Sequence, residues 1–200
     1  MAGDIGRLIE GLDIYDAAIL GFSMSGPVAF RAALEMPGRI SRLIMVSSIL
    51  PSAGRPKTEK ESKIQQEEIE ILRSQGPEGW ANALGIWDGP IVGAILKGNT
   101  AVKGIWERML KAHNPDYLEC MLKARLVTPS NINWRARMPE ITQPTLIIMG
   151  EQDKRFMDGA KLMAKTIPNS RLEIIPGAGH MVNLGKPEEF NKVLLDWMDN

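Results

Sequence analysis

The first fifty residues combine helical spacing of apolar positions with short, continuous apolar runs. Residues 3–13 carry apolar side chains at helical intervals, which predicts an amphipathic helix. Residues 15–21 and 40–47 have apolar centres and are predicted strands, and residues 24–36 between them are predicted to be helical. Near-continuous apolar strands are typical of a parallel sheet covered on both faces.

The pattern changes at Pro51. Residues 51–57 are predicted to be a loop, and from Thr58 to about Arg135 the spacing is helical, with no convincing strand. Breaks are expected at Gly76-Pro77, Gly89-Pro90 and Asn114-Pro115, between helices over 78–86, 99–112 and 116–125. The charge run over 57–70 fits a solvated helix face.

Tryptophan is concentrated in this middle segment, which holds Trp80, Trp87, Trp106 and Trp134. Tryptophan is large and usually well buried, so these side chains are expected to form a small core of their own. The alternative is that one or two of them, Trp87 and Trp106 in particular, line an apolar substrate pocket.

Strand character returns over 144–150 and again over 171–175, separated by a predicted helix over 157–166 and followed by a last helix from Pro187. The expected fold class is α/β, with about four parallel strands flanked by helices. Residues 1–50 and 136–200 are expected to form this core, and residues 51–135 a helical insert.

Composition narrows the classes of function. The 200 residues carry 24 Lys+Arg and 24 Asp+Glu, and this balance argues against a nucleic-acid partner. One cysteine, Cys120, excludes an intrachain disulfide and favours a reducing, cytoplasmic location. With one cysteine and two histidines, no zinc site has its usual ligands. No apolar run reaches membrane-spanning length, and no signal-peptide pattern is present.

A candidate nucleophile, Ser23, lies between the first predicted strand and the helix after it, in Gly21-Phe22-Ser23-Met24-Ser25-Gly26. A serine in a sharp strand-to-helix turn takes a strained backbone conformation, and residues two positions away must be small. Gly21 and Ser25 hold those positions, although Ser25 is larger than the usual glycine. The motif alone is short, and a serine before a helix is also a common N-cap.

Two further polar residues follow later strands. Asp153 follows the strand over 144–150, and His180 follows the strand over 171–175. The carboxyl ends of parallel strands meet at one edge of a sheet, where open α/β folds place their sites. A serine hydroxyl needs an imidazole to take its proton, and a carboxylate must orient that imidazole. Glu151 competes with Asp153 for the carboxylate role, whereas His113 fits a helix C-terminus.

These motifs resemble the α/β-hydrolase superfamily, especially small bacterial esterases, enol-lactone hydrolases and non-haem chloroperoxidases with a helical lid. The resemblance is carried by residues 21–26, Gly150-Glu151-Gln152-Asp153, Gly177-Ala178-Gly179-His180 and the helix at 187–190, in the family order Ser, Asp, His. It implies that the insert is a lid. Haloalkane dehalogenases share the fold but use an aspartate nucleophile, so Ser23 argues against that activity.

The resemblance also implies a difference from intact members, which carry several strands before the nucleophile. Only 22 residues precede Ser23, so the chain is expected to correspond to the carboxyl-terminal portion of such a hydrolase. The upstream loop that donates one oxyanion-hole N–H is then absent, and the backbone N–H of Met24 remains. The strand over 15–21 is expected to lie at an open edge and to promote self-association.

The resulting functional prediction is a serine hydrolase that cleaves a small carboxylic ester or lactone without metal or organic cofactor. Ser23 attacks the carbonyl, His180 transfers the proton, Asp153 orients His180, and Phe22, Trp87 and Trp106 contact the substrate. The alternatives are a weakly active or non-catalytic fragment, or a C–C hydrolase or acyltransferase of the same fold.

Overall fold

The computed structural model describes residues 2–50, 58–84, 100–127 and 132–199. The chain divides into two compact units, Met1–Ser52 with Asn133–Asn200, and Ala53–Ile132. The elements of the first unit are, in chain order, α1 (Ala2–Gly11), β1 (Ala17–Phe22), η1 (Ser23–Ser25), α2 (Gly26–Glu35), β2 (Ile40–Val46), η2 (Trp134–Glu140), β3 (Thr145–Gly150), α7 (Lys154–Thr166), β4 (Ser170–Ile175), α8 (Val182–Gly185) and α9 (Pro187–Met198).

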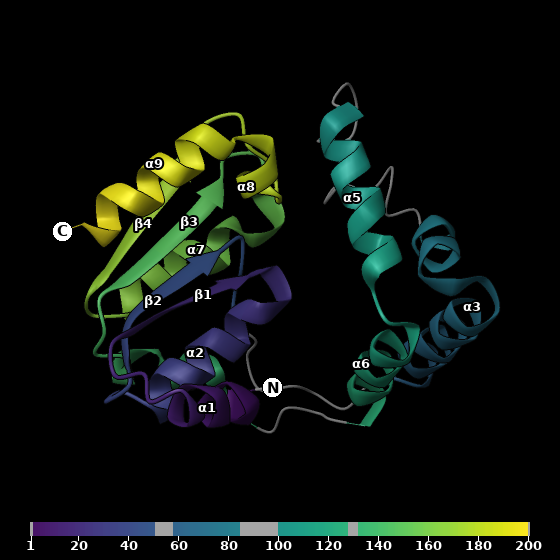
Figure 1. The fold of residues 1–200 in the computed structure, drawn as a ribbon, viewed down its shortest axis with the longest axis horizontal. Helices are drawn as coiled ribbons and strands as arrows, with labels where there is room; N and C mark the ends of the chain where they lie inside the picture. Colours follow the sequence, from purple (N-terminus) through teal and green to yellow (C-terminus); the bar gives the residue numbers. More distant parts are fainter. Residues whose placement is uncertain (1, 51–57, 85–99, 128–131, 200) are drawn as a thin grey trace. The chain divides into compact units, whose positions relative to one another are not determined.

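The first unit is built on a four-stranded sheet with the order β1-β2-β3-β4 (Figure 1). All neighbouring strands are parallel, with Leu20 opposite Ile44 and Ile44 opposite Leu146. The prediction of about four parallel strands flanked by helices is confirmed. Because every strand runs the same way, the residues that follow β1, β3 and β4 reach one edge of the sheet.

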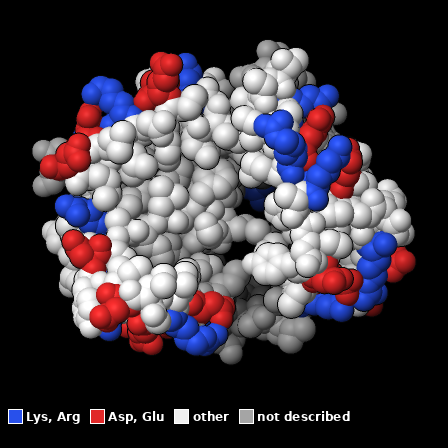
Figure 2. Space-filling model, viewed as in Figure 1, with Lys and Arg blue, Asp and Glu red and all other residues white. Residues whose placement is uncertain are grey.

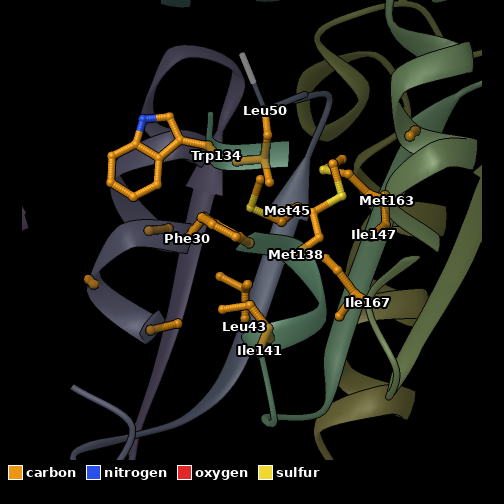
Figure 3. Close-up of a cluster of buried hydrophobic side chains, with 14 of the residues drawn as sticks. Phe30, Leu43, Met45, Leu50, Trp134, Met138, Ile141, Ile147, Met163 and Ile167 are labelled. Atoms are coloured by element: carbon orange, nitrogen blue, oxygen red, sulfur yellow. The ribbon is translucent and has the colours of Figure 1, made fainter. Parts of the chain in front are cut away.

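Apolar side chains cover both faces of this sheet. On one face, α2, α7 and η2 pack against the strands through a buried cluster that includes Phe30, Met45, Met138 and Met163 (Figure 3). On the other face, Phe190 of α9 and Val182 of α8 pack against Val46 and Ile148. Burial on both faces explains the continuous apolar character of β2 and β3.

Trp134 belongs to this sheet unit, so its expected place in the core of the insert was wrong. It begins η2, is buried, and packs edge-on against Phe30 with ring centroids 6.4 Å apart. The physical reason is its position in the chain, because η2 leads directly into β3 and must cover the same sheet face as α2. The guanidinium of Arg31 lies 5.9 Å from the Trp134 ring centroid, which adds a cation–π contact.

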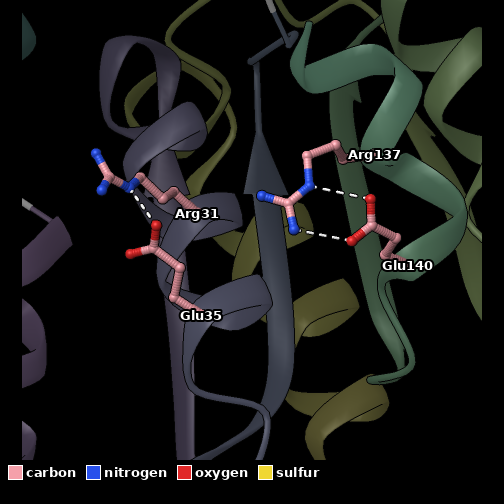
Figure 4. A network of polar contacts seen from close by, with 4 residues as sticks. All are labelled: Arg31, Glu35, Arg137 and Glu140. Atoms are coloured by element: carbon pink, nitrogen blue, oxygen red, sulfur yellow. Dashed lines mark hydrogen bonds and ion pairs between the residues drawn. The ribbon is translucent and has the colours of Figure 1, made fainter. Parts of the chain in front are cut away.

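Two ion pairs lie on the helices that cover this face of the sheet, one on α2 and one on η2 (Figure 4). Arg31 pairs with Glu35 at 2.7 Å, and Arg137 pairs with Glu140 at 2.8 Å. Hydrogen bonding to Arg137 lowers the pKa of the Glu140 carboxyl. All four side chains are substantially exposed, so each pair contributes little to the free energy of unfolding.

The second unit is helical and contains α3 (Glu59–Ala83), α5 (Thr100–Ala112) and α6 (Pro115–Val127). The break expected at 76–77 is a kink inside α3, where Gly76 has φ 70° and ψ −177°. Ile69 and Leu72 of α3 pack against Leu118 and Leu122 of α6.

An ion-pair cluster links the same two helices. Arg73 donates two hydrogen bonds to Glu119, at 2.9 and 2.7 Å, and Lys123 lies 2.5 Å from the same carboxylate. These contacts, chiefly the hydrogen bond from Arg73, lower the pKa of Glu119 to about 2. In the described segments of the chain, no helix has both the length and the apolar character needed to span a membrane.

Candidate active site

Ser23 stands at the carboxyl end of β1, in the strand-to-helix turn that its sequence predicts. Its φ of 50° lies in the left-handed region, which residues with a Cβ atom rarely adopt. Phe22 before it is extended, and the chain then enters η1 and α2. Such strain persists only where the surrounding structure enforces it, and it is common at functional sites.

Two glycines allow this turn because strand and helix cross at close range. A Cβ atom on Gly21 would lie 2.6 Å from the Cα of Gly26 and 2.8 Å from the Cβ of Ala29. A Cβ atom on Gly26 would lie 1.9 Å from the hydroxyl of Ser48. Both positions therefore require glycine for steric reasons.

Ser25 fills the position where a glycine is more usual, and its hydroxyl has a local role. Ser25 Oγ accepts a hydrogen bond from the Phe22 N–H and donates one to the Phe22 C=O, both at 2.8 Å. The side chain thus closes the turn around Ser23, which accounts for a residue larger than glycine at this position.

The loops after β3 and β4 are packed together at the same edge of the sheet. A Cβ atom on Gly150 would lie 2.2 Å from the carbonyl oxygen of Gly179, so the two backbones touch. The Gln152 N–H donates to the Ala178 C=O at 2.9 Å, and this bond holds the loops in register. As a result Asp153, at the start of α7, faces His180.

The structure brings Ser23, His180 and Asp153 into one hydrogen-bonded line. His180 Nε2 lies 2.8 Å from Ser23 Oγ, and His180 Nδ1 lies 2.7 Å from Asp153 Oδ2. His180 is 3% exposed and Asp153 is 7% exposed. With Nδ1–H donating to the carboxylate, Nε2 can accept the Ser23 proton, which is the geometry of a general base beside a nucleophile.

Two aromatic rings flank the imidazole. Phe22 lies 5.5 Å from the His180 ring and Phe156 lies 4.9 Å from it, measured between centroids. Phe22 was predicted to contact substrate, and here its ring packs against His180. Phe156 was missed in the sequence, although its position in the first turn of α7, three residues after Asp153, is the available signal.

The competing residues have other partners. Glu151 Oε2 accepts a hydrogen bond from the Gly177 N–H at 2.9 Å. His113 Nδ1 lies 2.6 Å from the Met109 carbonyl oxygen, one turn earlier in α5. Neither side chain belongs to the group formed by Ser23, His180 and Asp153.

The remaining predicted site residues are spread over the chain. Met24 directly follows Ser23 in η1, and its side chain is 55% exposed. Trp106 belongs to α5 of the helical unit, where its indole N–H is buried and has no hydrogen-bond partner among the described residues. Trp87 lies outside the described residues. Within the described ranges, no group of three or more His, Cys, Asp or Glu residues is arranged to hold a metal ion.

A family comparison covers nearly the whole chain. The sequence pattern of the family described as "Alpha/beta hydrolase family" matches residues 2–193.

Individual relatives agree with this match. The 2-hydroxy-6-oxononadienedioate/2-hydroxy-6-oxononatrienedioate hydrolase of Comamonas testosteroni is 28% identical over 204 residues, covering 100% of this chain and 68% of the relative. The solved structure of MenH from S. aureus has a TM-score of 0.81 and 26% identity, covering 99% of this chain and 73% of that chain. A thermophilic esterase from Thermogutta terrifontis shares the fold, with a TM-score of 0.80 and 23% identity, covering 99% of this chain and 70% of that chain.

Proposed function

The chain belongs to the alpha/beta hydrolase family, and we propose that it is a serine hydrolase that cleaves a small carboxylic ester or lactone. The observation that supports this most strongly is the line of two hydrogen bonds, 2.8 and 2.7 Å long, from Ser23 through His180 to Asp153. We propose that this reaction uses neither a metal ion nor an organic cofactor.

In the proposed mechanism, Ser23 Oγ attacks the substrate carbonyl while His180 Nε2 takes the hydroxyl proton. Asp153 holds the Nδ1–H and stabilises the imidazolium that forms. The oxyanion accepts a hydrogen bond from the backbone N–H of Met24. His180 then gives the proton to the leaving alcohol. In the second half of the reaction water attacks the acyl-enzyme, His180 takes a proton from that water, and His180 returns the proton to Ser23 Oγ as the acid leaves.

The test of this proposal is hydrolysis of p-nitrophenyl acetate and of a simple γ-lactone by the purified chain. Turnover is expected in the wild type and should fall to the background rate in Ser23→Ala. Equal turnover by a folded Ser23→Ala variant would contradict the proposal, and so would a well-folded wild type that hydrolyses neither compound.

A second candidate function is hydrolysis of a carbon–carbon bond next to a ketone. It is favoured by the 28% identity to the Comamonas testosteroni enzyme, which is named for a 2-hydroxy-6-oxo substrate. A 2-hydroxy-6-oxo-dienoate absorbs in the near ultraviolet, so loss of absorbance would report its cleavage. Turnover of this compound much faster than of the esters would favour the second candidate.

We further propose that the helical unit, Ala53–Ile132, forms a lid that selects substrates. The insert leaves the sheet unit after the carboxyl end of β2, the edge of the sheet that carries Ser23. Trp87→Ala or Trp106→Ala is then expected to change the preference among acyl-chain lengths without changing the reactivity of Ser23.

The free, exposed Cys120 suits the proposed cytoplasmic location.

A further inference from the structure

The carbonyl of Ser23 accepts a hydrogen bond from a buried side chain in the segment that follows β2, the strand next to β1. Ser48 Oγ donates to Ser23 O at 2.7 Å, and Ser48 is 1% exposed. The backbone N–H of Gly26 donates to the same oxygen. The strained residue is therefore held from two directions, by its own helix and by the segment after β2.

The segment that carries Ser48 is itself fixed. Ser47 before it is fully buried, has φ 45°, and donates its N–H to the Ile148 carbonyl at 2.9 Å. Leu50 after it is buried, and its carbonyl accepts a hydrogen bond from Arg135 Nε at 2.9 Å. The Ser48 hydroxyl also packs directly against Gly26, where a Cβ atom would lie only 1.9 Å away. Ser48 thus has little freedom to move away from Ser23.

We propose that Ser48 is a positioning residue for the Ser23 nucleophile, an inference that rests on the function proposed above. Its hydroxyl bonds the backbone carbonyl of Ser23 and not the reacting Oγ, so it takes no part in proton transfer. A left-handed conformation at Ser23 is unfavourable unless surrounding contacts impose it, and the Ser48 hydrogen bond is one of those contacts. Without it, the Ser23 backbone relaxes and Oγ moves away from His180 Nε2.

The test compares how fast and how completely a fluorophosphonate probe labels Ser23. In Ser48→Ala the labelling rate constant should fall about 10- to 100-fold, because small displacements of reacting groups have effects of that size. The final yield should stay at the wild-type level. A purely structural role would lower the final yield, because fewer chains are folded, and leave the rate constant of the folded chains unchanged.

Ser170 provides the matched control, because its hydroxyl donates to the Ile167 carbonyl at 2.8 Å, away from Ser23. Ser170→Ala should label at the wild-type rate. If Ser48→Ala does not fold, Ser48→Cys carries the test, because a thiol keeps the shape but is a weak donor, and an intermediate rate is expected.

Wild-type labelling rates in either folded Ser48 variant would overturn the positioning role while leaving the proposed function intact. Failure of the wild type to label would instead contradict the proposed function, and the positioning role with it.

Discussion

Glu151 and Gly177 are joined by a hydrogen bond in which the Gly177 N–H donates to Glu151 Oε2 at 2.9 Å. This bond ties the loop after β3 to the loop before His180. It gives Glu151 a role in holding the loops together, whereas Asp153, two residues later, reaches His180 Nδ1 at 2.7 Å. The two neighbouring carboxylates can therefore be separated by mutation.

Asp153→Asn should abolish most activity and Glu151→Gln should not. An amide in place of the Asp153 carboxylate favours the wrong tautomer of His180, and the equivalent change in a serine protease lowers kcat about 10⁴-fold. Glu151→Gln keeps an oxygen that can accept from the Gly177 N–H, so only a modest loss is expected. Initial rates of ester hydrolysis measure the loss of activity in both variants. A larger loss in Glu151→Gln than in Asp153→Asn would assign the orienting carboxylate to Glu151 instead of Asp153.

Gly21→Ala should destabilise the sheet unit by about 1–3 kcal/mol, because the added methyl group would overlap atoms of Gly26 and Ala29. Gly38→Ala is the matched control, since a Cβ atom there would lie within 4 Å of no atom in the described part of the chain. Urea unfolding followed by circular dichroism compares the two variants. Equal free energies of unfolding in both would show that the turn at Ser23 does not depend on a small residue at position 21.

The local parts of this fold could be predicted from the sequence because they depend on neighbouring residues. The apolar runs mark β1 to β4, and the small residues around Ser23 mark the sharp turn. The contacts that cross between elements could not be predicted in this way. The bond from Ser48 to Ser23 joins residues 25 positions apart, and the packing of Phe156 on His180 depends on how two loops meet. Trp134 was misassigned for the same reason, because its burial depends on the sheet beside it.

The helical unit should lose stability in acid through Glu119. Arg73 and Lys123 lower the pKa of this carboxyl in the folded chain to about 2, from an ordinary value of 4.5. The contribution of these contacts to the free energy of unfolding is complete above about pH 4.5. It is lost as the pH falls toward 2, because the Glu119 carboxyl of the unfolded chain is protonated at a higher pH than that of the folded chain.

Thermal unfolding at pH 6 and pH 3 tests this contribution. Glu119→Gln should lower the midpoint at pH 6 and have a smaller effect at pH 3. Glu107→Gln serves as the control, because Glu107 lies 4.0 Å from Lys103 in an exposed pair and should change little at either pH. An equal effect of Glu119→Gln at both values would contradict the account.

The chain should self-associate through the outer edge of β1. In the described residues β1 pairs only with β2. The Ala17 N–H donates a hydrogen bond to the Arg39 carbonyl, which lies on the β2 side of the strand. By alternation, the backbone groups of Ala18 and Leu20 point away from the sheet. Both side chains are exposed, and Figure 2 shows a mainly uncharged surface over this unit with charged groups near its rim. An open, uncharged edge is a template for strand pairing.

Size exclusion with light scattering should show oligomers of the wild type and mainly monomers of Ala18→Lys. Met109→Lys changes an exposed apolar side chain of the helical unit and should leave the association unchanged. A monomeric wild type at micromolar concentration would contradict this prediction without affecting the proposed chemistry.

The most direct test of the central claim is labelling of the purified chain with a fluorophosphonate probe, followed by mass spectrometry of the peptides. The probe reacts with activated serines and requires no knowledge of the substrate. We predict one label per chain, on Ser23, and no label in a folded Ser23→Ala variant. Labelling of another serine, or no labelling of the folded wild type, would contradict the assignment of Ser23 as a nucleophile activated by His180 and Asp153.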